Sequence, residues 1–308
     1  MTPKVFVTGA SGFVGQAVVK ELLERGYHVH ALLNRRPLDG FDGRVRAFSG
    51  GLFDQAALDA GIRGCSAAIH LVGIIMEDPE KDITFRRIHV QGTRNVVAAA
   101  GKNGVRRMLY MSALGSRPGA FTEYHRTKFQ AEQIVRDSGL DWTIVRPSLI
   151  HGPAGDFMRQ EARWVRHTAV PFLFMPYFGG GPFGCRGSGH LQPIYVGDVA
   201  RAIVDAMENP KHVGEVYLLG GPDKLTWREL HRTCSAAITG SPRLALPIPA
   251  WCGHLLSRVL PPALLPFNDD MVQMSQEDNA CDMTKFKSRF GWAPRPLEPT
   301  LKEYASQL

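Results

Sequence analysis

The chain has few cysteines, and they lie far apart. Its five cysteines form no C-x-x-C pair, which argues against both a metal site and a disulfide framework. A reducing, cytoplasmic setting therefore fits best. No window contains eighteen uninterrupted apolar residues, so we expect no transmembrane helix. The first residues contain no cationic segment leading into an apolar run, so we also expect no signal peptide.

The sequence also lacks internal repeats, low-complexity tracts and a basic stripe interleaved with aromatic residues. The formal net charge is +7 and the isoelectric point is near 9.3. Because the basic residues are scattered, we predict no nucleic-acid partner. A polyanionic cofactor, an acidic partner or anionic lipid would explain the charge as well. At 308 residues, the chain can bury a large core.

What the sequence does contain is a glycine-rich turn near its start. A short apolar run ending at Thr8 is followed by Gly9, Gly12 and Gly15, and then by a helical pattern over 16–25. A pyrophosphate can lie on the N–H groups of a helix N-terminus only where no Cβ atoms block its approach. The spacing therefore predicts a dinucleotide-binding turn. The alternative is an ordinary strand-to-helix turn.

Strand and helix patterns then alternate over residues 1–150. The predicted strands are 28–33, 45–48, 66–72, 107–112 and 142–147, and the predicted helices are 54–62, 83–103 and 122–136. This alternation predicts an α/β fold, namely a Rossmann-type, doubly wound parallel sheet of about seven strands. We expect residues 1–150 to form an NAD(P)-binding domain.

The end of the second predicted strand carries arginines where a carboxylate is expected. In this fold an acidic residue at that position bonds the 2′-hydroxyl of the adenosine ribose, whereas arginine receives a 2′-phosphate. The residues here are Asn34, Arg35 and Arg36. We therefore predict NADP(H) as the preferred cofactor, with NAD(H) as the second choice. Two solvated loop arginines are the alternative interpretation.

Beyond Pro147 the alternation loosens, and we expect residues 151–308 to form a smaller substrate and lid region. The segment 172–189 is rich in Gly, Pro and aromatic residues, which is typical of a mobile lid. A strand at 215–219 is expected to return to the main sheet, so that 213–238 belongs with the Rossmann part. Asp198 is expected to be the N-cap of a helix that ends at residue 208.

The candidate chemistry lies on the predicted helix 122–136 and on the strand before it. Tyr124 and Lys128 are four residues apart and share a helix face, so the ammonium can lower the pKa of the phenol. Tyr124 could then act as a general acid for a carbonyl, while Lys128 also reaches the ribose hydroxyls. Ser112 ends its strand at the edge where ligands bind, and it would hold the carbonyl oxygen.

Two further segments complete a set of motifs: Arg146-Pro147 and Gln192-Pro-Ile-Tyr-Val-Gly-Asp-Val-Ala-Arg201. With the glycine turn, Ser112 and Tyr124-x-x-x-Lys128, they resemble a short-chain dehydrogenase/reductase of the extended or atypical type over most of the first 235 residues. Other segments are similar to the NADPH-binding accessory subunit of respiratory complex I and its bacterial relatives, often labelled NAD-dependent epimerase/dehydratase: 70–75, 88–97, 111–115 and 124–128.

The resemblance implies two alternative functions. Active members imply an NADP(H)-dependent oxidoreductase that acts on a carbonyl or hydroxyl of a sugar-like or lipid-like small-molecule substrate, with Ser112, Tyr124 and Lys128 as catalytic residues. The mitochondrial member is thought to hold its nucleotide structurally, which implies a non-catalytic accessory or assembly protein of a membrane respiratory complex. We favour the enzyme. The predicted cofactor-binding residues are Gly9, Ser11, Gly12, Phe13, Val14, Gly15, Asn34, Arg35, Arg36, Leu52, Leu71, Val72, Gly73, Tyr124, Lys128 and Pro147.

The sequence departs from the family pattern at two places. The extended reductases usually have Gly-Asp-Leu after the third strand, where the Asp meets the adenine, but this chain has Gly50-Gly51-Leu52. The helix motif usually begins with Asn, and here His89 stands in that position. We expect His89 and His70 to be interior residues rather than catalytic bases.

The C-terminal segment 244–267 contains Trp251 and many leucines, with arginines nearby. Such an amphipathic surface can contact a hydrophobic substrate, a membrane complex or a membrane surface. A helix packed on its neighbours is the interpretation that we favour. Contact with a membrane would make the protein peripheral at the inner face.

Overall fold

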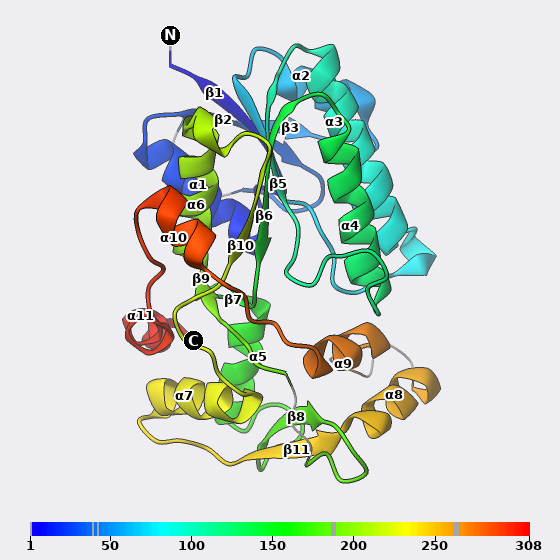
Figure 1. Ribbon diagram of the computed structural model, residues 1–308, viewed down its shortest axis with the longest axis vertical. Helices are drawn as coiled ribbons and strands as arrows, with labels where there is room; N and C mark the ends of the chain where they lie inside the picture. The colour runs from blue at the N-terminus through cyan, green and yellow to red at the C-terminus, as the bar shows by residue number, and fades with distance from the viewer. Residues whose placement is uncertain (1, 39, 42, 186–188, 261–264, 266) are drawn as a thin grey trace. The chain divides into compact units, whose positions relative to one another are not determined.

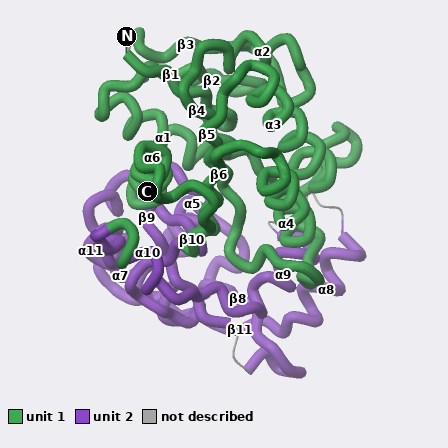
Figure 2. Tube along the Cα trace, turned by 45° about the horizontal axis from the view of Figure 1, so that its top comes forward, with its two compact units in different colours: residues 1–147, 196–218, 288–290 green, residues 148–195, 219–287, 291–308 purple. Residues whose placement is uncertain are grey.

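The computed structural model describes residues 2–38, 40–41, 43–185, 189–260, 265 and 267–308. The chain forms two compact units, drawn in green and purple in Figure 2. Unit 1 comprises 1–147, 196–218 and 288–290, and unit 2 comprises 148–195, 219–287 and 291–308. The chain therefore leaves unit 1 after Pro147 and later returns to it.

Unit 1 is built on a seven-stranded sheet, which confirms the predicted Rossmann-type fold (Figure 1). The strands lie in the order β10-β6-β5-β4-β1-β2-β3, and the pairs among β1 to β6 are parallel. Their bounds are β1 (Lys4–Thr8), β2 (His28–Leu33), β3 (Val45–Ser49), β4 (Ala67–His70), β5 (Arg107–Met111), β6 (Asp141–Pro147) and β10 (Glu215–Leu219). The strand order reverses between β1 and β4, which is where ligands bind in open α/β sheets.

Helices cover both faces of this sheet. On one face lie α1 (Phe13–Glu24) and α6 (Val196–Glu208), and on the other lie α2 (Gln55–Ile62), α3 (Gly92–Lys102) and α4 (Glu123–Arg136) (Figure 1). The short turns η1 (Pro79–Lys81) and η3 (Pro210–His212) join the longer elements. Coverage on both faces explains why strands such as β1 are continuously buried after their first residue.

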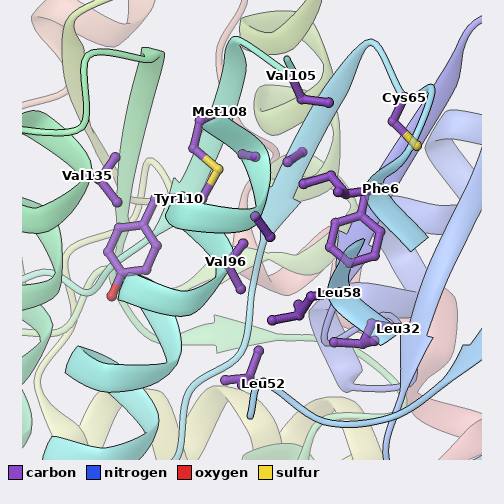
Figure 3. Packing of buried hydrophobic residues seen from close by; sticks show 14 of the residues in the cluster. Phe6, Leu32, Leu52, Leu58, Cys65, Val96, Val105, Met108, Tyr110 and Val135 are labelled. Atoms are coloured by element: carbon purple, nitrogen blue, oxygen red, sulfur yellow. The ribbon is translucent and has the colours of Figure 1, made fainter. Parts of the chain in front are cut away.

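The main core of unit 1 lies between the sheet and helices α2 to α4. Figure 3 shows Phe6 of β1 and Leu58 of α2 on one side of it, with Met108 and Tyr110 of β5 near Val96 of α3. Phe6, Leu58, Met108 and Val96 are each fully buried. Burying side chains of this size contributes roughly 1.5–3 kcal/mol each, so the core fixes the sheet on which the strand ends are displayed.

Arg25, at the end of α1, joins α1 to α6 on the other face. Its guanidinium donates to Glu21 at 2.6 Å and forms ion pairs with Asp205 at 2.7 Å and Glu208 at 2.7 Å. These three carboxylates raise the pKa of Arg25 above its ordinary value against the opposing effect of burial. The returning segment 196–208 is therefore held to unit 1 by charge as well as by packing.

The predicted helix 83–103 is not one continuous α-helix. It consists of the π-helical segment η2 (Arg86–Gln91) followed directly by α3. A π-helical turn is wider than an α-helical turn, and it often occurs where a side chain must be re-aimed at a functional site. His89, which lies in η2, is that side chain here.

Unit 2 contains two small parallel ribbons and several short helices. One ribbon pairs β7 (Ile150–His151) with β9 (Ile194–Tyr195), and the other pairs β8 (Met175–Gly179) with β11 (Ala245–Pro249). The helices are α5 (Asp156–Val165), α7 (Trp227–Thr239), α8 (Ala250–Val259), α9 (Asp269–Gln276), α10 (Thr284–Phe290) and α11 (Leu297–Tyr304), followed by the turn η5 (Ala305–Gln307).

Two predictions for the second half of the chain need correction, and the lid at 172–189 stays a prediction. That segment contains strand β8, and its residues 186–188 lie outside the described residues. Of the expected return 213–238, β10 joins the main sheet but α7 belongs to unit 2. Helix α6 begins at Val196, so Asp198 lies in its first turn instead of at its N-cap. A carboxylate there still interacts favourably with the positive end of the helix.

The turn between β1 and α1 depends on a close backbone approach. Gly9 has a φ of +78°, and the N–H of Gly12 donates to its carbonyl at 3.0 Å. A Cβ atom at Gly15 would lie 1.9 Å from the Gly9 oxygen. Only glycine therefore allows α1 to begin this close to the end of β1.

We predict that Gly15→Ala lowers the free energy of unfolding by at least about 2 kcal/mol, because the backbone must shift to admit the methyl group. Urea unfolding without nucleotide measures this. The matched control is Gly101→Ala in α3, where a Cβ would meet nothing within 4 Å. It should raise the free energy of unfolding by roughly 0.5–1 kcal/mol through helix propensity. Equal effects of the two substitutions would contradict the proposed contact.

Candidate active site at the sheet edge

The predicted site residues lie just beyond strand ends that are level with one another. Thr8 of β1 is in register with His70 of β4, and His70 is in register with Tyr110 of β5. The residues that follow these three strands therefore leave the same edge of the sheet. They include Gly9, Leu71 and Ser112.

The glycine turn offers a binding place for an anion. Gly12 is the N-cap of α1, and no described side chain caps this helix end. A Cβ atom at Gly12 would touch the Gly9 oxygen at 3.2 Å and no other atom within 4 Å. The N–H groups of Phe13 and Val14 belong to the first turn of α1, where a helix has no acceptor of its own for them. A pyrophosphate fits this arrangement.

The second strand end presents exposed positive charge. Asn34, Arg35 and Arg36 follow β2 directly, and all three are exposed. The third strand is followed by Gly51, whose missing side chain would lie 3.6 Å from the Asn34 amide. Leu52 is buried, and its carbonyl accepts from the Asn95 amide at 2.9 Å. This corner therefore has the two arginines and lacks the family's usual carboxylate.

His70 links three elements in the interior. Its Nδ1 atom lies 2.6 Å from the Thr8 hydroxyl, and its Nε2 atom lies 3.0 Å from the Thr93 hydroxyl. Complete burial, together with the charge of Lys128, lowers the pKa of His70 to about 3. The neutral ring therefore joins β1, β4 and α3 as a structural residue.

His89 connects the loop after β4 to helix α4. Its Nε2 atom accepts from the Ile74 N–H at 3.1 Å, so Nδ1 carries the proton and donates to the Thr127 hydroxyl at 2.9 Å. Burial, with the nearby Lys128, lowers the pKa of His89 to about 2. Its ring also lies edge-on to that of Tyr124, with centroids 5.5 Å apart. His89 thus fixes the position of residues 72–74 beside Tyr124.

Lys128 is buried at the centre of the site. Its ammonium donates to the Met111 carbonyl at 2.7 Å and lies 4.8 Å from the centroid of the Tyr110 ring. Burial lowers the pKa of Lys128 to about 7, although Glu132 opposes this shift. A Cβ atom at Gly73 would be 3.4 Å from the amine, so the loop after β4 passes directly over it.

The expected effect of Lys128 on Tyr124 is not found. Tyr124 as a whole residue is partly buried. Burial of its hydroxyl raises the pKa of Tyr124 to about 12. Desolvation disfavours the phenolate, and the Lys128 amine is itself directed at the Met111 carbonyl. Tyr124 is therefore a protonated donor at neutral pH.

Ser112 follows Met111 and is buried. Its hydroxyl donates to the Ser116 hydroxyl at 3.2 Å, and its N–H donates to the Val145 carbonyl at 2.8 Å. The fold thus brings Ser112 and Lys128 to neighbouring positions through Met111, and it brings Gly73 and Tyr124 together through His89. Pro147, at the end of β6, is buried, and its carbonyl accepts from the N–H of Leu114.

The comparisons with known proteins agree with this geometry. A model of the NAD(P)H-binding family matches residues 9–163, which is half of the chain. The chain belongs to this family. It is 30% identical to cinnamoyl-CoA reductase 1 of Oryza sativa subsp. japonica over 253 residues, covering 70% of this chain and 71% of the relative. The nicotinamide cofactor, the oxidoreductase character and the extended short-chain dehydrogenase/reductase family are thereby supported.

The chain is also similar to a mitochondrial protein in sequence and to a solved structure in fold. The chain is 28% identical to NADH dehydrogenase (ubiquinone) 1 alpha subcomplex subunit 9, mitochondrial, of Arabidopsis thaliana, covering 79% of this chain and 60% of that subunit. The solved structure of MoeE5 in complex with UDP-glucose and NAD superposes with a TM-score of 0.75 at 20% identity, over 99% of this chain and 98% of that one. At that identity the structure shows the fold alone.

Sequence reasoning about this NAD(P)H-binding chain missed an ion pair behind the site. Glu132 is fully buried, and its two carboxylate oxygens accept from Arg146 at 2.7 Å and 2.6 Å. Arg136 lies 3.6 Å away. The signal was available, because Glu132 follows Lys128 by four residues and so shares its helix face. The pair anchors α4 to β6.

The described residues contain neither a cluster of metal ligands nor a membrane-spanning helix. No group of three histidine, cysteine or acidic side chains among them could hold a metal ion. Within the same part of the chain, no helix has the length and apolar content needed to cross a bilayer.

Lys128 should make stability depend on pH in a defined direction. Its ordinary pKa is 10.5 and its folded pKa is about 7, so unfolding takes up a proton between these values. Stability therefore rises with pH across that window. We predict that the free energy of unfolding of the wild type, relative to Lys128→Met, increases from pH 7 to pH 9.

Urea unfolding at several pH values measures this difference. Lys20→Met is the matched control, because the Lys20 side chain is 73% exposed, and its difference from the wild type should stay flat. A flat difference for Lys128→Met as well would mean that the buried amine keeps its ordinary pKa.

Proposed function

We propose that the protein is an NADP(H)-dependent oxidoreductase that interconverts a carbonyl and a hydroxyl on a sugar-like or lipid-like small molecule. The observation that carries the proposal is the assembly of Tyr124, Lys128 and Ser112 at one strand edge, next to a turn that fits a pyrophosphate. The family membership supports the nicotinamide cofactor, and relatives named as reductases support the reaction class.

The residues of unit 1 fit the cofactor. The N–H groups at Gly12 to Gly15 would hold the pyrophosphate, and the loop 71–73 would lie along the nucleotide. Ser11, Asn34, Leu52 and Pro147 would complete its binding site. When bound, the nicotinamide supplies or accepts a hydride. Lys128 would bind the ribose hydroxyls with the same amine that now donates to the Met111 carbonyl.

Tyr124 would supply the proton for the carbonyl oxygen. A phenol with a pKa of about 12 is fully protonated at neutral pH, so it can donate a proton to a carbonyl oxygen that gains negative charge. The Ser112 hydroxyl would donate a second hydrogen bond to that oxygen. Its present partner, the Ser116 hydroxyl, keeps it oriented.

The preference for NADP(H) rests on Arg35 and Arg36. Both side chains are exposed at the end of β2, and arginine is the residue best suited to bind a 2′-phosphate bidentately.

A second function is favoured by one specific finding. Relatives of the chain include the mitochondrial complex I subunit named above and its mouse counterpart. In that case the protein would be a non-catalytic NADPH-binding accessory or assembly protein of a membrane respiratory complex. Nucleotide binding would then stabilise unit 1, and Tyr124 would have no catalytic role.

The variant Tyr124→Phe separates the two functions. We predict that it reduces NADPH-dependent carbonyl reduction by roughly 10²- to 10⁴-fold, which is the usual contribution of a general acid, while the dissociation constant for NADPH is unchanged. The substrates to test are an aromatic CoA thioester, a nucleotide sugar and a long-chain ketone, with loss of NADPH absorbance as the signal. If the wild type turns over none of them and the variant behaves identically, the accessory function is the better description.

The double variant Arg35→Asp with Arg36→Asp tests the cofactor preference. We predict that it weakens NADPH binding at least tenfold, because it removes charge-assisted hydrogen bonds, while NADH binding stays the same or improves. Arg63→Asp with Arg94→Asp changes the net charge equally at two exposed positions of unit 1 and is the control. Equal losses in the two double variants would show that only long-range charge attracts the phosphate.

A further inference from the structure

Exposed apolar side chains are concentrated in unit 2. Among the described residues, fifteen large hydrophobic side chains are exposed, and eleven of them lie in segments 170–183 and 244–260. The two most exposed of the fifteen are Leu173 at 84% and Phe183 at 81%. Scattered exposed residues need no explanation, but a concentration of this kind marks an interaction site.

The two segments lie together in the fold. Strands β8 and β11 pair in parallel with Ala245 opposite Met175, and α8 contacts both strands. The Trp251 indole, at the start of α8, donates to the Pro182 carbonyl at 3.1 Å, which places the Phe183 loop beside the helix. Figures 1 and 2 both draw β8, β11 and α8 next to one another. We call the exposed apolar side chains of Phe183 and of 251–260 the α8 surface.

Helix α8 shows which of its sides is outward. Gly253 is buried, and a Cβ atom there would be 2.6 Å from the Phe178 ring and 2.9 Å from Val272. Trp251, Leu255 and Val259 recur at intervals of four residues on the opposite side, and each is at least half exposed. The prediction that this helix would be packed on its neighbours is therefore right for one side only.

The two segments that carry the α8 surface contain formal charge of one sign. Segments 162–197 and 230–268 contain six arginines and no acidic residue, whereas the rest of the chain contains thirty basic and twenty-nine acidic residues. Almost the whole net charge of +7 therefore comes from the two segments that carry the α8 surface. The basic residues are spread along the whole chain, and the positive charge is concentrated here because these two segments lack acidic residues.

The carboxylates that face these segments are few. Asp269 of α9 accepts from the His254 ring at 2.7 Å and lies 3.9 Å from Arg258. Glu161 is fully buried with His231, and the exposed Asp278 bonds His190. Arg258 nevertheless remains 74% exposed, on the same side of α8 as Trp251 and Leu255.

We propose that the α8 surface binds an anionic membrane surface. An interfacial site needs apolar side chains that enter the acyl boundary, an aromatic residue at the headgroup level and basic residues that meet lipid phosphates. The α8 surface has the apolar Leu255 and Val259, the aromatic Trp251 and the exposed Arg258. The two segments that carry it contain arginines and no acidic residue, which complements an anionic bilayer. The inference does not depend on whether unit 1 turns over a substrate.

The test is sedimentation of the full chain with vesicles of phosphatidylcholine, with or without phosphatidylglycerol. We expect binding to the anionic vesicles and little binding to the neutral ones. Leu255→Ser with Val259→Ser should weaken binding roughly tenfold or more, because two apolar side chains that would enter the bilayer are lost. Arg258→Glu should weaken it about fivefold or more. The emission of Trp251 should shift to the blue on binding, and Trp251→Phe should remove that shift.

The control is Phe121→Ser with Val213→Ser, which removes exposed apolar side chains of unit 1 (69% and 38% exposed) and should leave vesicle binding unchanged. NADPH binding and the thermal midpoint verify that each variant is folded. Absence of binding to anionic vesicles, or equal binding by all variants, overturns the proposal. So does a wild-type dimer that Leu255→Ser with Val259→Ser converts to a monomer, because the surface would then be covered by a second copy.

Discussion

The backbone contact between Gly9 and Gly15 is the constraint on which unit 1 depends. Because α1 begins against the carbonyl that ends β1, its N–H groups open at the same sheet edge where β4 and β5 end. The same helix is held to α6 through Arg25, so the segment that returns from unit 2 is attached to the element that forms the phosphate turn. A shift of α1 would therefore disturb both the phosphate turn and the attachment of α6 through Arg25.

Around that turn the site is held by buried polar groups that are neutral or paired. His70 and His89 each use both ring nitrogens, and Glu132 uses both carboxylate oxygens on Arg146. Leaving any of these groups without a partner would cost about 1–3 kcal/mol, so the network admits essentially one arrangement. The loop after β4 and the Tyr124 ring are consequently positioned before a nucleotide arrives.

Much of unit 1 could be predicted because its local signals agree. Its strands are short apolar runs, and the predicted helix 54–62 is found as α2, with the Asp54 side chain as its N-cap. The π-helical turn at η2 could not be predicted, because it depends on two distant partners of His89. The β8–β11 ribbon was missed because its residues are rich in Pro and Gly, and because strands seventy residues apart pair through tertiary contacts.

The pKa of Tyr124 was mispredicted for a related reason. The spacing of four residues places Lys128 on the same face, but it does not reveal that the amine is directed at the Met111 carbonyl and is itself desolvated. Sequence separation gives proximity, whereas the charge that a neighbour exerts depends on its own burial. The same limit applied to helix α8, whose apolar pattern indicated an amphipathic helix but not which side stays exposed.

The buried amine is compatible with both an enzyme and a structural nucleotide holder. A holder needs the phosphate turn and the two arginines after β2, all of which are backbone or surface features that cost the fold little. Lys128, by contrast, is desolvated strongly enough to lower its pKa to about 7, and its ion-paired neighbour Glu132 only partly offsets that cost. A buried amine at the strand edge indicates a functional site there, and binding of the nucleotide ribose by that amine would serve either of the two functions.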